Sequence, residues 1–136
     1  MNFLKKMSFL KVRKAHKTEN TEDYLELIAD LLNKYGEARI VDIADKLNIA
    51  QSTANKTIKR LRSQGYIKKE PYRSIFLTLK GQKIANFSKK RHKIVFNFLL
   101  NLGLSKEVAY ADSEGIEHHV SNKTLSKMEK FNKKIS

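Results

Sequence analysis

Carboxylate and imidazole side chains recur at helical spacing in two separate parts of the chain. Two carboxylates three residues apart share one face of a helix, and a later Glu-x-x-Glu-His run places its members at i, i+3 and i+4. Oxygen donors with some imidazole suit Mn²⁺, with Fe²⁺ and Zn²⁺ as competitors. The spacing alone leaves two interpretations open, a divalent-metal site and ordinary solvent-facing helix surfaces. The candidate ligands are Asp23, Glu26, His92, Glu114, Glu117 and His118.

The composition excludes several classes of protein. The chain has 136 residues and no Cys, which excludes disulfide scaffolds, thiolate metal sites and cysteine-nucleophile enzymes. No apolar run approaches the ~20 residues of a membrane span. No secretory signal peptide is evident either. We therefore expect a cytoplasmic protein without a membrane partner.

The positive charge is concentrated in the middle of the chain. The formal net charge is +14, from 28 Lys and Arg against 14 Asp and Glu. Residues 51–93 hold thirteen of the basic side chains against Glu70 alone, whereas residues 18–50 and 94–120 each carry a net negative charge. An excess of this size indicates a polyanionic partner, most often nucleic acid.

The apolar periodicity predicts the elements that must position these groups. A helix capped by Asn20 or Thr21 ends at Gly36, a short helix covers residues 40–48, and a second short helix covers residues 51–64. Two short helices joined by a turn of about three or four residues are typical of a helix-turn-helix.

Downstream of these helices the pattern predicts a β-hairpin and then further helices. Residues 65–77 alternate about a turn at 71–73, which is typical of the wing of a winged helix. Thr78 then caps a helix that runs to Asn101, followed by helices over residues 105–119 and from Ser121 or Asn122 to Phe131.

These elements predict a mainly α fold. An N-terminal winged helix-turn-helix with a two-stranded wing precedes an α-helical dimerisation domain. We expect a basic extension over residues 1–18, the DNA-binding domain over 19–80, and the metal-binding and dimerisation domain over 81–136. For the extension, disorder and a DNA-contacting arm both remain open, and both are favoured over a membrane-surface helix or a transit peptide.

The second short helix and the wing carry the side chains expected to contact DNA. Recognition helices present their N-terminal and outward residues to base edges, where Asn and Gln pair with adenine and Lys reaches phosphates. The competing interpretation is a solvated helix face that happens to be rich in Lys and polar groups. The candidates are Gln51, Ser52, Thr53, Asn55, Lys56, Lys59 and the wing-tip Arg73, with Lys68 and Lys69 on the hairpin.

Five stretches of the chain then resemble one known family. They are residues 22–28, 36–39, 91–95, 97–103 and the run Glu-Gly-Ile-Glu-His-His at 114–119, which is the most specific of them. From about Glu19 to Met128 the chain is similar to the manganese transport regulators of the diphtheria toxin repressor family. The resemblance implies a manganese-dependent DNA-binding regulator, mainly a repressor of metal-uptake and homeostasis genes.

The resemblance also implies roles for individual residues. The family's two-metal cluster matches all six candidate ligands named above, which implies about two Mn²⁺ per subunit. Iron-responsive relatives carry Met and Cys at the positions of Asp23 and Glu117, so the carboxylates here favour manganese. His119 matches a position outside the ligand set. Metal would cancel the repulsion of four carboxylates, so that the first helix docks on the later helices and fixes the dimer.

The implied partners are a palindromic double-stranded operator and a second copy of the chain, with no small-molecule substrate. The apolar residues expected at the dimer interface are Phe96, Phe98, Leu99, Leu100 and Leu102. Two alternatives remain. One is a winged-helix regulator that responds to another divalent metal or to a small organic ligand. The other is a dinuclear metal hydrolase acting on nucleic acid. We expect no enzyme, because no general acid or phosphate-binding loop accompanies the ligands.

Overall fold

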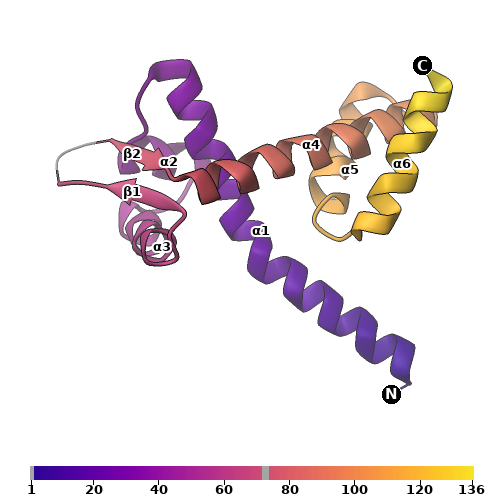
Figure 1. Ribbon diagram of the computed structural model, residues 1–136, viewed down its shortest axis with the longest axis horizontal. Helices are drawn as coiled ribbons and strands as arrows, with labels where there is room; N and C mark the ends of the chain where they lie inside the picture. Colours follow the sequence, from indigo (N-terminus) through magenta and orange to yellow (C-terminus); the bar gives the residue numbers. More distant parts are fainter. Residues whose placement is uncertain (1, 72–73) are drawn as a thin grey trace. The chain divides into compact units, whose positions relative to one another are not determined.

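The computed structural model describes residues 2–71 and 74–136, and the side chains of these except for residues 12–19. The chain divides into two compact units, each described here by itself. We call Asn20–Phe87 the winged unit, and Met1–Glu19 together with Ser88–Ser136 the helical unit. The elements, in chain order, are α1 (Phe3–Tyr35), α2 (Ile40–Leu47), α3 (Gln51–Ser63), β1 (Ile67–Lys69), β2 (Ile75–Leu77), α4 (Leu79–Asn101), α5 (Lys106–Ile116) and α6 (Asn122–Ile135) (Figure 1).

The winged unit is built on a helix-turn-helix, as predicted. Three residues separate α2 from α3, and the first of them, Asn48, adopts the left-handed conformation with φ 55°. The amide of Ile49 donates to the carbonyl of Ala44 at 3.0 Å and closes the turn. Because Ile43, Ile58 and other inward residues are fully buried against α1, the two helices are held by their apolar faces.

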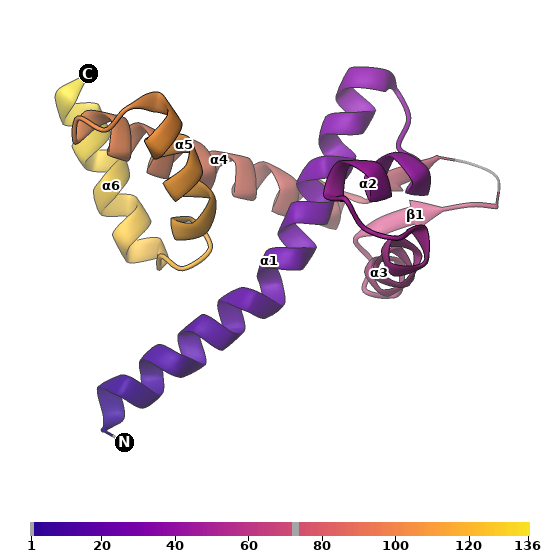
Figure 2. The ribbon, with the colours of Figure 1, turned by 180° about the vertical axis from the view of Figure 1, so that it is seen from behind.

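The predicted wing is confirmed by the antiparallel hairpin of β1 and β2, seen from behind in Figure 2. Ile67 pairs with Leu77 and Lys69 with Ile75. The amide of Ile75 donates to the carbonyl of Ala38 at 2.8 Å, which ties the hairpin to the loop between α1 and α2. The predicted turn residues Tyr72 and Arg73 lie outside the described residues.

The predicted start of the first helix at Asn20 or Thr21 is wrong, because α1 begins at Phe3. The basic extension expected over residues 1–18 is therefore, from Phe3 onward, the first half of α1. A favourable capping residue starts a helix only where the chain before it cannot be helical. Residues 3–20 contain no Pro or Gly, so nothing in them interrupts the helix. The predicted end at Gly36, with φ 75°, is confirmed.

In the helical unit, α5 and α6 pack against the second half of α4 (Figures 1 and 2). Val95, Leu99, Ala109 and Leu125 are among the residues that form its core. Thr78, Ser105 and Ser121 cap α4, α5 and α6, each accepting a hydrogen bond from a backbone amide three residues on.

The predicted helix over residues 105–119 is too long, because α5 ends at Ile116. The amide of His119 donates to the carbonyl of Ile116 at 2.9 Å, an i→i−3 bond that tightens the last turn. Ser121 is extended, with ψ 163°, so that its side chain can cap α6. The chain must leave the helical conformation before that cap.

The apolar stretch expected at a dimer interface is only partly exposed. Leu99 is buried, and Phe96, Phe98 and Leu100 pack against the same core, whereas Leu102 is 57% exposed. Two further apolar side chains next to it, Leu104 and Val108, are 39% and 44% exposed. Part of the outward apolar surface therefore lies at the α4–α5 connection. Among the described residues, no helix is both long enough and apolar enough to cross a membrane.

Candidate metal centre and nucleic-acid interface

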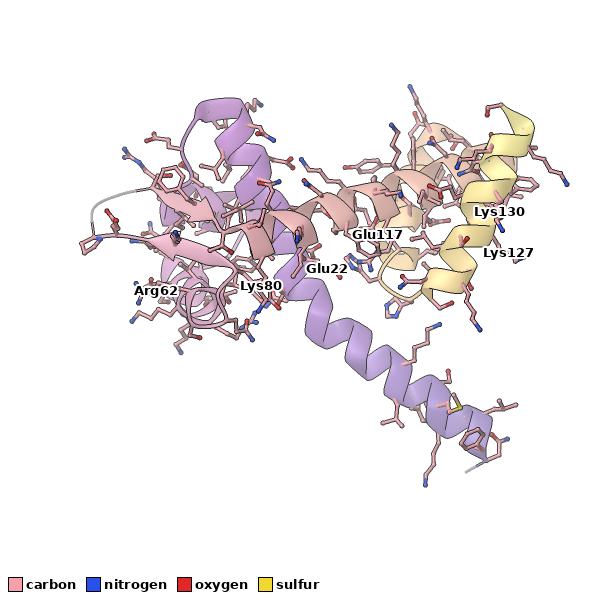
Figure 3. The ribbon with its side chains drawn as sticks, viewed as in Figure 1. Glu22, Arg62, Lys80, Glu117, Lys127 and Lys130 are labelled. Atoms are coloured by element: carbon pink, nitrogen blue, oxygen red, sulfur yellow. The ribbon has the colours of Figure 1, made fainter. Side chains whose placement is uncertain are left out.

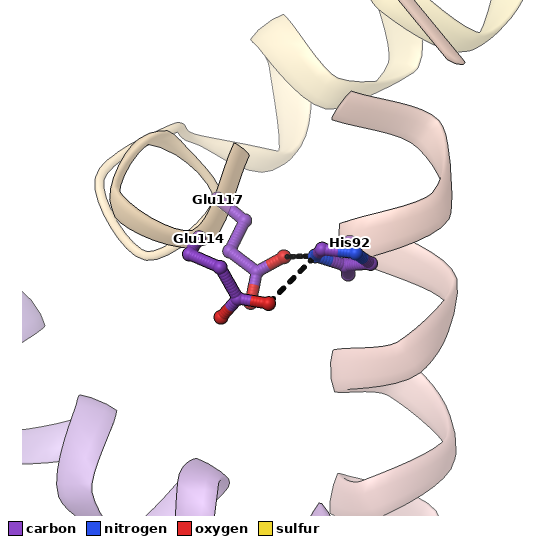
Figure 4. Close-up of side chains that lie close together, drawn as sticks. All are labelled: His92, Glu114 and Glu117. Atoms are coloured by element: carbon purple, nitrogen blue, oxygen red, sulfur yellow. Dashed lines mark hydrogen bonds and ion pairs between the residues drawn. The ribbon is translucent and has the colours of Figure 1, made fainter. Parts of the chain in front are cut away.

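Three of the predicted metal ligands meet inside the helical unit. His92 lies on α4, while Glu114 and Glu117 lie three residues apart at the end of α5, on its side toward α4 (Figure 4). The His92 Nδ1 and the Glu117 Oε2 share a hydrogen bond of 2.7 Å, and the same nitrogen lies 3.6 Å from the Glu114 Oε1. One donor atom from each residue lies within 4.8 Å of the other two.

Glu117 is the buried member of this group. Its side chain is only 2% exposed, and burial raises its pKa from 4.5 to about 7, although the nearby His92 and His118 act to lower it. The Nε2 of His118, whose side chain is also buried, lies 3.4 Å from the Glu117 Oε1. A carboxylate held away from water needs a proton or a cation beside it.

The donor atoms of His92, Glu114 and Glu117 fit a divalent cation of borderline to hard character. Carboxylate oxygens and an imidazole nitrogen converge from two helices, and their separation is that of groups which can share one ion. Such donors suit Mn²⁺, Fe²⁺ and Zn²⁺. The raised pKa of Glu117 supports the fit, because bound metal would supply the positive charge that the buried carboxylate lacks.

An aromatic wall that sequence reasoning missed holds the ring of His92. Tyr110 meets the His92 ring edge-on, with ring centroids 5.4 Å apart, and Phe96 stacks on it at 6.2 Å. Tyr110 precedes Glu114 and Glu117 by four and seven residues, so all three share one face of α5. The sequence already contained that spacing. The ring contact assigns Tyr110 to the positioning of His92.

The remaining candidates of the metal set lie elsewhere. Asp23 and Glu26 belong to the winged unit, where both are half-buried on α1. His118 touches Glu117 but is not a member of the group of three. His119 lines a hollow of about 500 Å³ with Asp112 and Ile116 on the outside of α5. The structure thus brings together His92, Glu114 and Glu117, with His118 against Glu117.

The outward face of α3 carries the predicted DNA-contacting residues. All six of them on this helix are exposed, while Ala54, Ile58 and Leu61 on the opposite face are buried. This is the arrangement that a recognition helix requires, since its polar face must be free to enter a groove of DNA. The six are Gln51, Ser52, Thr53, Asn55, Lys56 and Lys59. Arg73, the seventh candidate, lies outside the described residues.

A groove of about 210 Å³ continues this face toward the wing. Asn55, Lys59 and Lys69 line it, together with Arg62, which sequence reasoning missed. Figure 3 labels Arg62 on α3. Arg62 follows Asn55 by seven residues and Lys59 by three, so the helical spacing could have identified it. The groove places cationic groups of α3 and β1 side by side.

Polar contacts from α1 and α4 hold the C-terminal end of α3 in place. The Arg60 guanidinium donates to the Thr21 hydroxyl of α1 at 3.1 Å and to the Gln64 side chain at 3.1 Å. At the same C-terminal end of α3, the Lys80 ammonium donates to the Gln64 carbonyl at 3.0 Å and lies 4.5 Å from the centre of the Tyr66 ring. The orientation of the exposed face is therefore set from both α1 and α4.

Comparison with known proteins gives consistent matches along almost the whole chain. Residues 16–75 match the N-terminal DNA binding domain of the iron dependent repressor family, and residues 78–136 match the metal binding and dimerisation domain of the same family. The chain is 50% identical over 126 residues to the transcriptional regulator MntR of Escherichia coli O6:H1, covering 93% of this chain and 81% of that protein.

Two further similarities agree with these matches. The chain is 53% identical over 117 residues to MntR of Salmonella typhimurium, covering 86% of this chain and 74% of that protein. Its structure is similar to that of the manganese regulator SloR, with a TM-score of 0.71 and 27% identity, covering 82% of this chain and 52% of SloR.

Proposed function

The chain belongs to the iron dependent repressor family, and from this premise we propose that it is a manganese-dependent regulator of transcription. The observation that carries the proposal is the convergence of His92 and Glu114 on the buried carboxylate of Glu117. The exposed face of α3 supplies the DNA-binding half of the same function.

Manganese is the metal that the donor set and the relatives favour together. The chain has no Cys to select a softer ion, and its similar proteins include regulators named MntR and a manganese regulator. We further propose two ions per subunit, with Asp23, Glu26 and His118 as additional ligands. That assignment rests on the match of their sequence positions to the ligands of the family.

The residues of the site would act mainly through charge. Four carboxylates repel one another when they are brought close together, and a bound divalent cation supplies the opposite charge that removes this repulsion. Glu117 is held in place by the His92 ring, which Phe96 and Tyr110 orient. The carboxylates of the site therefore define where a bound cation is needed.

DNA binding would fall to α3 and the wing. The exposed Asn55 and Gln51 can pair with adenine edges, and Lys56, Lys59 and Arg62 can reach phosphates. We propose that the protein acts as a homodimer on a palindromic operator in the cytoplasm, because two-fold symmetry in a dimer of recognition helices requires matching half-sites. The exposed Leu102, Leu104 and Val108 are the proposed dimer surface.

Binding of the full chain to DNA in the presence of different metals tests the proposal. An operator duplex is first selected from a pool of random-sequence duplexes by binding to the protein in Mn²⁺. The affinity of the protein for this operator is then measured with Mn²⁺, Fe²⁺, Zn²⁺ and no metal at fixed salt. We expect Mn²⁺ to raise the affinity by about 5- to 150-fold. An equal affinity with and without every metal would contradict the proposal, and titration of Mn²⁺ without stoichiometric binding would favour a regulator of another ligand class.

A further inference from the structure

The last helix of the chain carries a row of lysines that the proposed function does not use. One face of α6 packs inward: Leu125 is buried, and the Phe131 ring lies 5.3 Å from that of Phe98. On the same side the Asn132 amide donates to the carbonyl of Ile94 at 3.0 Å. The opposite face carries four exposed lysines, which we call the lysine stripe: Lys123, Lys127, Lys130 and Lys134.

The spacing of the lysine stripe keeps its charges in one line. Successive members are separated by four, three and four residues, so they fall within one narrow sector of the helix. At 1.5 Å per residue the stripe extends about 16 Å along α6. Figure 3 shows Lys127 and Lys130 on this helix. A row of cations at this spacing is suited to an extended anionic chain and not to a single small anion.

The stability of α6 does not account for the stripe. A helix is stabilised by acidic residues in its first turn, but α6 has none there and has Lys123 instead. Lysines three and four residues apart on one face repel each other. The acidic residue of α6, Glu129, lies off the stripe, with its carboxylate 3.9 Å from the Lys90 ammonium of α4. The charges of Lys123, Lys127 and Lys130 thus do not stabilise the helix that carries them, whereas Lys134 lies in the last turn, where a cation is favourable.

The basic surface continues from α6 onto α4. A groove of about 550 Å³ lies between the two helices, and Lys90, Lys93 and Lys133 are among its lining residues. Glu129 lines the same groove and offsets part of this charge. The surface of the helical unit therefore combines the stripe on α6 with further lysines beside it.

We propose that the lysine stripe binds the phosphate backbone of double-stranded DNA, as a contact independent of base sequence and separate from the base-reading face of α3. The exposed side chains in the sector of the stripe are Lys and Ser, with no aromatic ring to stack on a base, and the exposed apolar Ile135 of α6 lies about 100° around the helix from Lys134. Lysine ammonium groups neutralise phosphates as point charges. The inference rests on the proposed function only in that the protein works on DNA.

Salt dependence of DNA binding by the full chain tests this assignment. The probe is a duplex of random sequence without metal, so the measurement does not depend on Mn²⁺ or on an operator. We compare the wild type with a stripe variant, Lys123→Gln with Lys127→Gln and Lys130→Gln. The matched control is Lys34→Gln with Lys83→Gln and Lys106→Gln, which removes the same charge from exposed positions outside the stripe.

Each phosphate contact contributes about 0.9 to the slope of log affinity against log salt. We expect the stripe variant to lower that slope by about two to three and the control to lower it by less than about one. Replacing the same three lysines by Arg keeps the charge and is expected to preserve the slope. Circular dichroism and thermal melting of each variant check that α6 is folded.

Two results would overturn the assignment. One is a slope for the stripe variant equal to that of the control. The other is loss of binding to phosphatidylserine vesicles by the stripe variant with an unchanged DNA slope, which would assign the stripe to a membrane surface. Failure of the proposed function appears separately, as an operator affinity that does not respond to Mn²⁺ while the metal-free slopes still differ.

Discussion

The two units place their functional side chains in opposite settings. In the winged unit the DNA-contacting residues of α3 stand on the surface of a scaffold with fourteen buried residues in one apolar cluster. In the described part of the helical unit the corresponding cluster has five buried residues, and four polar residues there are also buried: Ser88, Ser113, Glu117 and His118. The winged unit exposes its candidate contact residues, whereas the helical unit buries Glu117 and His118 and leaves Glu114 exposed.

This difference in burial indicates where a bound cation is expected to have the largest effect. The scaffold of α3 is held by apolar burial and by the Arg60 and Lys80 contacts, none of which needs a bound ion. Glu117, in contrast, is a buried carboxylate whose ionised form is disfavoured until a cation is near. We therefore expect the buried Glu117 of the helical unit to contribute most to metal binding, and changes made in either unit test this contrast.

The largest effect is expected from removing the buried carboxylate. Glu117→Ala should lower the affinity for Mn²⁺ by more than about 100-fold, because even the outer partners of metal ligands contribute 10- to 100-fold. Isothermal titration measures this directly. Glu107→Ala, an exposed carboxylate in the first turn of the same helix, is the control and should bind Mn²⁺ like the wild type. Equal loss in both variants would count against a site at Glu117.

A backbone contact in the winged unit should be the next most sensitive. Gly81 lies in the first turn of α4, and a Cβ there would overlap the Tyr66 backbone carbonyl oxygen. Gly81→Ala should therefore destabilise the protein by about 1–3 kcal/mol, the usual effect of overpacking. Chemical denaturation without metal measures it. An unchanged midpoint would show that the close packing of α4 on this turn is not required.

Two substitutions on α3 separate base reading from phosphate binding. Asn55→Ala should reduce operator affinity by about 1–3 kcal/mol and relax the sequence preference at one base pair. Lys56→Gln should weaken binding to all sequences alike and reduce the salt slope by about one. Competition binding with single-base operator variants distinguishes the two. Identical behaviour of both variants would argue against α3 as the recognition helix.

The pH dependence of metal binding follows from Glu117. Since its pKa in the metal-free protein is about 7, metal must displace a proton below that pH, and affinity should fall about tenfold per pH unit. The folded-state pKa lies above the ordinary 4.5, so the folded protein holds the proton more tightly than the unfolded chain. Its contribution to metal-free stability is therefore present below pH 4.5 and lost as the pH rises through about 7.

Titration of Mn²⁺ across this pH range, and melting without metal, measure both trends. Glu117→Gln cannot ionise and is expected to remove this part of the pH dependence of melting. A wild type and a variant with the same pH profile would contradict the assignment.

The smallest effect is expected at the other helical glycine. Gly115 lies inside α5 with no neighbouring atom within 4 Å of a Cβ placed there. Gly115→Ala should stabilise the metal-free protein by about 0.5–1 kcal/mol, because alanine favours the helix. In thermal melting, Gly115→Ala should raise the melting temperature and Gly81→Ala should lower it. Destabilisation by both substitutions would contradict the expected difference between the two glycines.

Local signals predicted most of the fold. The helix-turn-helix, the wing and the ends at Gly36 and Asn48 follow from apolar spacing and from residues that tolerate the left-handed conformation. The start of α1 could not be predicted from the candidate caps Asn20 and Thr21, because nothing before them interrupts a helix. The end of α5 was also misjudged, since it depends on the cap that the next helix needs at Ser121.

The candidate site was less accessible to sequence reasoning. Spacing placed Glu114 and Glu117 on one face, but only the packing of α5 on α4 brings them to His92 and buries Glu117. Tyr110 and Arg62 were present in the same helical periodicities and were overlooked. The membership of Asp23, Glu26 and His118 in the metal site stays a prediction.

The most direct test of metal-controlled DNA binding is a titration of Mn²⁺ into the full chain, alone and with saturating operator duplex. Because coupling between two ligands is reciprocal, DNA should raise the affinity for Mn²⁺ by the same factor, about 5- to 150-fold, by which Mn²⁺ raises the affinity for DNA. The same Mn²⁺ affinity with and without the operator would contradict the account.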